Sequence, residues 1–188
     1  MGVFCKSAPI RRLLIFRPGS LGDTVVALPS LHLIARAFPE AERWIITNRP
    51  VTPVSVPVKN LLDGSGLVDG YFEADYALVR SRFIVQWHLR KRIKQWQPDA
   101  LVYIPGRRSL KDVCREWTFF STCGIGRLIG TPFKASLREN LWEQETQRFE
   151  HEASRLARCL RSLGEARLDD PESWSLALDP VEVASARS

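Results

Sequence analysis

The residues best suited to chemistry lie in a short loop that holds Gly19, Gly22 and Asp23. The loop follows an apolar run and precedes a helical pattern, a setting in which free backbone N–H groups collect anions. A carboxylate there would repel an anion, but it could accept a proton from a substrate hydroxyl. It could equally cap the helix, because a carboxylate at a helix start satisfies free N–H groups. The two roles are compatible, although capping stabilises the anion and weakens it as a base.

The loop does not match the common nucleotide-binding motifs. Its spacing, Gly19-x-x-Gly22, differs from the G-x-G-x-x-G of dinucleotide-binding folds, and the Lys-Ser/Thr of a P-loop is missing. An NAD-binding domain also needs an acid near the end of its second strand, where this sequence has Arg49. The pattern therefore fits neither a dinucleotide site nor a P-loop, and taken alone it favours helix capping over proton transfer as the role of Asp23.

Alternating strands and helices position this loop. Buried-strand patterns occur at residues 11–16, 42–47, 67–72, 99–104 and 126–131, and residues 175–178 are a further candidate strand. Helical spacing is expected at 25–38, 80–97 and 111–124, and from 143 onward along a stripe of Phe149, Ala153, Leu156, Leu160 and Leu163 that ends at Gly164. This alternation predicts an α/β fold, a Rossmann-like parallel sheet with helices on both faces.

Composition narrows the class of partner. The 188 residues carry a formal net charge of +6, which favours a polyanion such as nucleic acid, anionic lipid or a phosphorylated small molecule. No helix-turn-helix, RNA-binding aromatic motif or zinc finger is present, so nucleic acid is disfavoured. The four cysteines are scattered without metal-ligand spacing, which predicts no metal site and reduced thiols in the cytoplasm. The N-terminal apolar run is too short for a signal peptide or a membrane span.

Several runs of the sequence together resemble those of a known family. The run "LLIFRPGSLGDTVVALPSLHLIARAFPEAE" is similar to the opening of the bacterial ADP-heptose:lipopolysaccharide heptosyltransferases, with Arg17, Gly22, Asp23 and Pro29 at the motif positions. Further likeness lies in "PDALVYIPG", "GRLIGTP" and "HEASRLARCLRSLG". The resemblance thus extends over most of the chain, from Leu13 to Gly164.

The resemblance implies the N-terminal, acceptor-binding half of a GT-B glycosyltransferase, at residues 1–175, with residues 176–188 beginning a linker. Such enzymes invert the anomeric carbon without a metal or other cofactor, and Asp23 matches their general base. Ser20, Leu21 and Gly22 then belong to the acceptor site. The donor would be a nucleotide-activated sugar such as ADP-heptose, held by a C-terminal domain whose motifs this sequence lacks. The acceptor would be an anionic lipid-linked saccharide at the cytoplasmic face of the inner membrane.

The same resemblance assigns further acceptor residues. The family's His-x-x-x-Arg matches His151 and Arg155, an (i, i+4) pair expected to point away from the apolar stripe. Basic residues after its third strand match Arg80 and Arg82. Without the family, His151 and Arg155 would be read as solvated surface residues.

Arg107 and Arg108 follow the fourth strand directly, which places them to meet acceptor phosphates or carboxylates by bidentate contacts. We therefore expect them to surround the mouth of the cleft near Asp23, together with the other arginines assigned above.

Two surfaces remain open to interpretation. Arg90, Lys91 and Lys94 form a basic face opposite Leu89, Ile93 and Trp96, which is either a solubilising surface or a patch for anionic lipid. The aromatic cluster Trp117, Phe119 and Phe120 is expected to fill the core rather than to stack on a sugar. The alternative to a transferase is a non-catalytic basic α/β module that binds an anionic lipid or another polyanion, in which Asp23 only caps a helix.

Overall fold

The computed structural model describes residues 9–49, 56–74 and 83–178, which form a parallel five-stranded sheet with the order β3-β2-β1-β4-β5. The strands are β1 (Arg12–Phe16), β2 (Glu42–Asn48), β3 (Gly70–Ala74), β4 (Ala100–Tyr103) and β5 (Leu128–Ile129). All five coincide with apolar runs in the sequence. The predicted Rossmann-like α/β class is confirmed.

β1 is the centre of the sheet and pairs with β2 on one side and β4 on the other. Its side chains alternate, as the pleat requires. Leu13 and Ile15 belong to one buried cluster, whereas Leu14 and Phe16 belong to the other. Both faces of the sheet are therefore covered, and the strands consequently read as continuous apolar runs rather than alternating ones.

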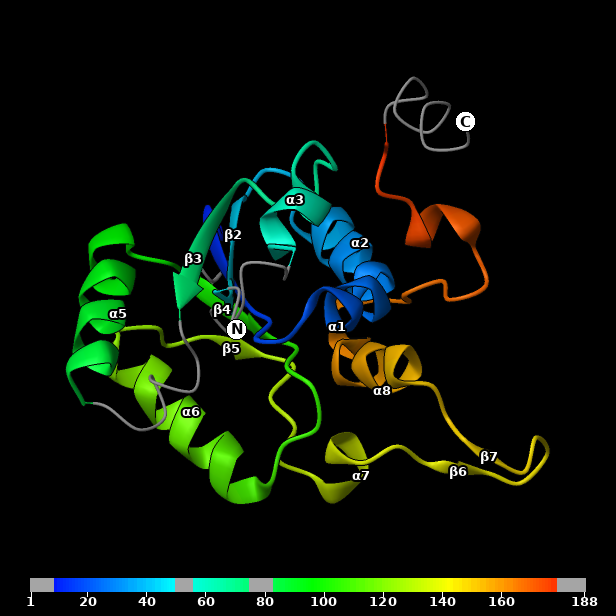
Figure 1. Cartoon of the computed structure of the whole chain (residues 1–188). Helices are drawn as coiled ribbons and strands as arrows, with labels where there is room; N and C mark the ends of the chain where they lie inside the picture. The colour runs from blue at the N-terminus through cyan, green and yellow to red at the C-terminus, as the bar shows by residue number, and fades with distance from the viewer. Residues whose placement is uncertain (1–8, 50–55, 75–82, 179–188) are drawn as a thin grey trace, which may run out of the picture.

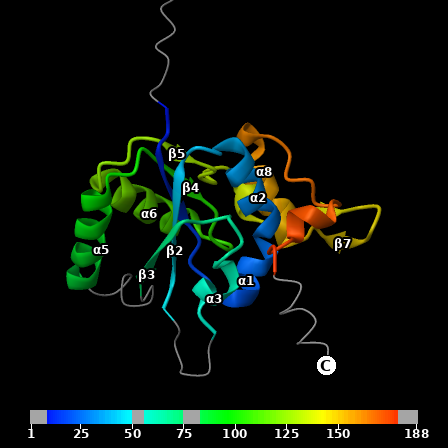
Figure 2. The same ribbon diagram turned by 90° about the horizontal axis from the view of Figure 1, so that it is seen from above.

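Helices form a layer on each side of the sheet (Figures 1 and 2). One layer contains α1 (Leu21–Val26), α2 (Leu28–Ala37), α3 (Val58–Leu62) and α8 (Glu152–Cys159). The other contains α5 (Phe83–Trp96) and α6 (Leu110–Thr122). A short helix, α7 (Ala135–Arg138), and a hairpin of β6 (Trp142–Glu143) and β7 (Arg148–Phe149) precede α8 and extend from the body of the domain (Figure 1).

The helix predicted at 25–38 is two helices, α1 and α2, joined at Ala27. Pro29 lies in the first turn of α2, where its missing N–H costs nothing. The chain therefore restarts its helix at this proline. The consequence for the site is that α1 is a separate short element, which carries Asp23 in its first turn.

Two expectations for the C-terminal part are wrong. Phe149 lies in β7 with 65% of its surface exposed, so the apolar stripe of α8 begins only at Ala153. Residues 175–178 form no strand, although Leu176 packs against the core after the turn at Pro171–Trp174. Phe149 and Ala153 have the i, i+4 spacing of a helix by chance, because Phe149 ends the hairpin and Ala153 lies in α8. The boundary at residue 175 stays a prediction, because residues 179–188 lie outside the described ranges.

Candidate functional site

The candidate site lies where β1 and β4 end. The sheet order reverses between these strands, and open α/β sheets bind ligands at the carboxyl ends of strands beside such a reversal. Arg17 follows β1 and leads into the glycine loop, while Arg107 and Arg108 lie in the loop after β4. The topology thus brings the acid and the two arginines predicted from sequence to one edge of the sheet.

A capping box fixes Asp23. The N-cap of α1 is Ser20, and Asp23 is the third residue of the helix. The Asp23 Oδ2 accepts hydrogen bonds from the Ser20 backbone N–H at 2.7 Å and from the Ser20 hydroxyl at 2.8 Å. Since half of the carboxylate side chain is exposed, it remains accessible to a substrate. Capping by Asp23 is confirmed, in partnership with Ser20.

Gly19 is required by the position of Asp23. A Cβ on Gly19 would lie 2.8 Å from the Asp23 Cβ and 2.9 Å from its Oδ2, closer than real Cβ atoms approach. Gly22 is different, because a Cβ there would meet only the Ser20 hydroxyl, at 4.0 Å. Only one of the two glycines in the loop is therefore needed for the placement of the carboxylate.

Arg17 lies buried beneath the loop and ties it to β4. One terminal nitrogen donates to the Ile104 carbonyl at 3.0 Å, the other donates to the Asp23 carbonyl, and the Asp23 carboxylate lies 4.0 Å away. Burial lowers the pKa of Arg17 to about 10, against the opposing effect of Asp23, so the guanidinium stays charged at neutral pH. Sequence reasoning placed Arg17 in the family motif but gave it no role; the structure makes it the support of the loop.

The electrostatics of Asp23 favour the ionised form. Partial burial raises its pKa, but the hydrogen bonds from Ser20 and the charges of Arg17 and Arg108 outweigh burial, and the net effect lowers the pKa. The carboxylate is therefore ionised at neutral pH and is a weak base.

Arg108 is partly buried and engaged with an acid. Its Nε lies 3.4 Å from the Glu116 carboxylate, and its terminal nitrogen donates to the Arg107 carbonyl at 3.1 Å. The side chain of Arg107 itself is exposed. The positive charge of Arg108 lowers the pKa of Asp23, so the two groups interact electrostatically. Arg80 and Arg82 lie outside the described residues, so their assignment stays a prediction.

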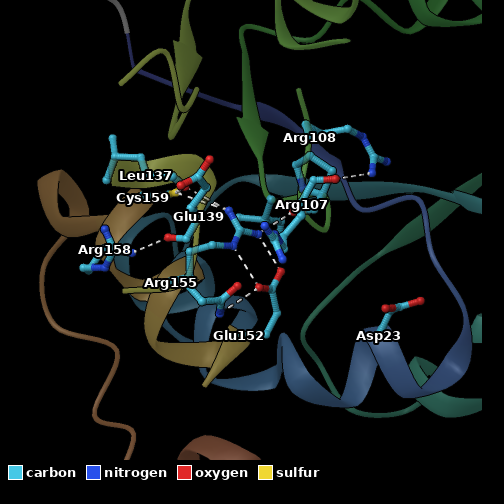
Figure 3. A network of polar contacts seen from close by, with 12 residues as sticks. Asp23, Arg107, Arg108, Leu137, Glu139, Glu152, Arg155, Arg158 and Cys159 are labelled. Carbon is cyan, nitrogen blue, oxygen red and sulfur yellow. Dashed lines mark hydrogen bonds and ion pairs between the residues drawn. The ribbon is translucent and has the colours of Figure 1, made fainter. Parts of the chain in front are cut away.

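Arg155 differs from its predicted placement. It is 2% exposed, and its guanidinium donates to the Glu152 carboxylate at 2.8 and 2.5 Å and to the Leu137 and Pro105 carbonyls at 3.0 Å each. Figure 3 shows this network with Asp23 to one side. The expectation that Arg155 points away from the apolar stripe is wrong, because the side chain joins α8 to α7 and to the end of β4.

His151 is exposed and is the N-cap residue of α8, where its carbonyl accepts from the backbone N–H groups of Ser154 and Arg155. Its side chain therefore does not form an exposed pair with Arg155. The role of His151 in acceptor binding stays a prediction.

A second capping arrangement in the chain resembles that of Asp23. At the start of α6, Ser109 is the N-cap, and its hydroxyl donates to Asp112 at 2.8 Å. Asp112 also pairs with Arg115 at 2.8 Å and is 19% exposed at its side chain, whereas Asp23 is 51% exposed. Capping geometry alone is thus shared by both acids. What distinguishes Asp23 is its exposure and its position at the end of the central strand.

Sequence reasoning missed one buried acid near the site. Glu116 is 6% exposed, accepts a hydrogen bond from the Tyr103 hydroxyl at 2.5 Å and lies between Arg108 and Arg115. Burial raises its pKa to about 8. A signal was present in the sequence, because Glu116 interrupts the apolar stripe of α6 between Val113 and Phe120.

The structure shows where the basic face of α5 and the aromatic residues of α6 lie. Leu89 and Ile93 are buried while Lys91 and Lys94 are exposed, as predicted for α5. Phe120 is buried and Phe119 packs against the core, but the expectation for Trp117 is wrong. Trp117 is 42% exposed and contacts the exposed ring of Phe133, edge to face.

The described residues offer neither a metal cluster nor a membrane-spanning helix. Across residues 9–49, 56–74 and 83–178, no group of three or more His, Cys, Asp or Glu side chains is arranged to hold a metal ion. Within the same ranges, no helix is both long and apolar enough to cross a membrane.

Comparison with solved structures shows which proteins share this fold. E. coli heptosyltransferase WaaC with ADP-2-deoxy-2-fluoro heptose is 14% identical, with a TM-score of 0.57, over 88% of this chain and 52% of that one. A family 9 glycosyl transferase from Veillonella parvula is 11% identical, with a TM-score of 0.53, over 82% and 42%. WaaC with ADP is 16% identical, with a TM-score of 0.51, over 82% and 47%.

At these identities the comparison shows the fold, which this chain shares with part of glycosyltransferase structures. The chain spans about half the length of the solved structures it matches. A scan against protein-family models found no match, and neither did a search of curated proteins.

Proposed function

We propose that this chain is the acceptor-binding half of an inverting glycosyltransferase that acts without a metal, with Asp23 as the general base. The observation that carries the proposal is an exposed carboxylate, fixed by Ser20 and Gly19 at the end of the central strand. The shared fold with two heptosyltransferase structures supports a sugar as the transferred group.

The proposed reaction transfers a sugar with inversion at its anomeric carbon. Asp23 accepts the proton of an acceptor hydroxyl while that oxygen forms a bond to the anomeric carbon. The bond between that carbon and the nucleotide diphosphate breaks on the opposite face, and the diphosphate leaves with the electron pair. Asp23 is a weak base, so the proton moves late, as the oxygen bonds to the sugar and becomes acidic. The arginines beneath and beside the loop keep the carboxylate ionised before the reaction.

The acceptor is proposed to be anionic, as in a lipid-linked saccharide that carries phosphate or carboxylate groups. Arg107 and Arg108, together with Arg80 and Arg82, would hold those groups, because the guanidinium fork grips them bidentately. The net charge of +6 would also attract such a molecule. Arg155 is left out of this set, because its guanidinium is committed to protein groups.

The donor is proposed to be a nucleotide-activated sugar of the ADP-heptose class, bound mainly by a second domain. The solved structures that contain ADP or an ADP-heptose analogue are about twice the length of the matched segment. We further propose that the protein works in the cytoplasm at the inner membrane surface. The outer face of α5 suits anionic lipid, because Lys91 stacks on the exposed Trp87 and Lys94 lies one turn further.

The alternative, a non-catalytic module for a polyanion, is favoured by one observation. Asp112 has a similar capping arrangement at the start of α6, so Asp23 needs no catalytic role to explain its position. The alternative does not explain why the Asp23 carboxylate is exposed, nor why residue 19 beside it must be a glycine. The two proposals differ in which residues the anionic ligand contacts.

Nuclear magnetic resonance tests the binding site directly on the isolated chain. A delipidated lipopolysaccharide-core oligosaccharide is titrated into ¹⁵N-labelled protein, and ADP-heptose is titrated separately. The proposal predicts amide shifts at Gly22, Asp23 and Arg108 with the oligosaccharide, and no tight binding of ADP-heptose. Absence of these shifts, or shifts confined to α5, would favour the polyanion module instead.

A further inference from the structure

A cavity of about 450 Å³ lies between the sheet, α5 and α6, outside the site described so far. Its floor is the side chain of Phe16 at the end of β1, with Ile46 of β2. Leu89 of α5 and the rings of Phe119 and Phe120 of α6 form much of its wall. The volume falls within the range of small-molecule sites, and such sites are mainly apolar with a few polar groups at fixed places.

The sequence of α6 explains why the cavity is open. Cys114, Thr118 and Thr122 all line it and are spaced four residues apart, so they occupy one face of the helix. Each has a small side chain, so none reaches across the gap toward α5. A leucine or phenylalanine at these positions would fill the space, as large side chains do in ordinary helix packing.

Charged groups in the lining connect the cavity to the candidate acceptor site. Arg115 and Glu116 both belong to its lining. Glu116 contacts Arg108, whose charge acts on Asp23. The apolar space is thus separated from the proposed anion-binding arginine by a single side chain. Arg115, which pairs with Asp112 at 2.8 Å, is 39% exposed and adds a second cation to the lining.

We propose that this cavity binds the apolar chain of an anionic amphiphile whose charged group rests on Arg108 and Arg115. An apolar chain suits the part of the lining formed by Phe16, Phe119 and Leu89, because these side chains offer a hydroxyl no hydrogen-bond partner. An alkyl or acyl chain gains free energy there through burial of its methylenes. The identification of the amphiphile with the acceptor rests on the proposed function; the binding of the chain does not.

Alkyl phosphates test the proposal on the isolated 188-residue protein. Isothermal titration calorimetry compares inorganic, butyl, hexyl and octyl phosphate below their micelle concentrations. We expect affinity to rise about fourfold for each methylene, the factor that corresponds to roughly 0.8 kcal/mol. No dependence on chain length in the wild type would overturn the proposal.

Two variants on α6 separate the cavity from its surroundings. Thr118→Phe places a ring in the cavity and should abolish the chain-length dependence, while inorganic phosphate binds as before. Lys111→Phe puts the same ring at an exposed position outside the lining and should leave the dependence intact. Equal chain-length dependence in Thr118→Phe and wild type would also overturn the proposal.

A chemical probe keeps the test independent of the folding of Thr118→Phe. Cys114 is exposed and lines the cavity, so octyl phosphate should slow its alkylation by iodoacetamide in the wild type, measured by peptide mass spectrometry. Inorganic phosphate should not. Equal alkylation rates with both would contradict the proposal. None of these measurements uses a sugar, so they stand or fall separately from the oligosaccharide titration.

Discussion

Replacing Arg155 tests whether this side chain supports the fold or binds an acceptor. Arg155→Met keeps the apolar bulk of the side chain but removes every hydrogen bond of the guanidinium. The Pro105 carbonyl then loses its donor, the Leu137 carbonyl keeps only the weak Cys159 thiol donor at 3.5 Å, and the Glu152 carboxylate loses its cation. An exposed acceptor-binding arginine would contribute nothing to stability, so the two roles predict different outcomes.

The expected loss can be worked from these contacts. Removing one partner of a buried ion pair destabilises a protein by about 3–5 kcal/mol. The Glu152 side chain is 26% exposed and can be partly hydrated after the change, which favours the lower end. The buried Pro105 carbonyl adds to the loss, because an unsatisfied buried acceptor costs roughly 1–3 kcal/mol. We therefore expect a loss of about 4–6 kcal/mol in the free energy of unfolding.

Urea unfolding followed by tryptophan fluorescence and circular dichroism measures this loss. Arg155→Lys keeps the charge but not the fork and should lie between Arg155→Met and wild type. The double variant Arg155→Met/Glu152→Gln should recover part of the loss, since no unpaired carboxylate remains. A loss below about 1 kcal/mol, the range of exposed ion pairs, would refute the network as described.

Two further predictions concern the loop and the buried acid. Gly19→Ala should displace the Asp23 carboxylate, because the alanine Cβ would lie 2.8 Å from that side chain, and NMR should detect a changed Asp23 pKa. Gly22→Ala should leave this pKa unchanged and stabilise α1 by up to about 1 kcal/mol. Equal effects of the two substitutions would show that Gly19 does not position the acid. Because the pKa of Glu116 is raised to about 8 by burial, folding favours its protonated form, so the stability of wild type relative to Glu116→Gln should fall as pH rises from 5 to 8.5. A relative stability that stays constant over that range, measured by urea unfolding, would mean that Glu116 titrates normally.

Much of the fold could be predicted because strand and helix periodicity are local signals. The five apolar runs, the α6 helix and the buried face of α5 all follow from residue spacing. Phe149 could not be placed this way, because its spacing from Ala153 suits a helix while the residues between them form the end of a hairpin and a helix cap. The break at Ala27 was signalled only by Pro29, which is also common inside the first turn of a continuous helix.

Sequence patterns located the part of the site that lies at strand ends but not the buried charged residues. Asp23, Ser20 and the arginines after β4 lie at strand ends, whose location follows from topology. Arg155 and Glu116 were misjudged or missed, since charged residues are ordinarily exposed and their burial depends on partners distant in sequence. Pro105 lies 50 residues from Arg155, and Tyr103 lies 13 from Glu116. No local pattern reveals such partners.

The rate of sugar transfer by matched aspartate variants tests the central claim most directly. The chain is joined to the part of E. coli heptosyltransferase WaaC that it does not match, and transfer from ADP-heptose to a core acceptor is followed by mass spectrometry. Asp23→Asn should fold normally, because asparagine can still accept from Ser20, and should lower the rate about a hundredfold or more. Asp112→Asn, which alters the comparable cap of α6, should leave the rate unchanged. Transfer by Asp23→Asn at the wild-type rate, or an equal loss in both variants, would contradict the assignment of Asp23 as the base.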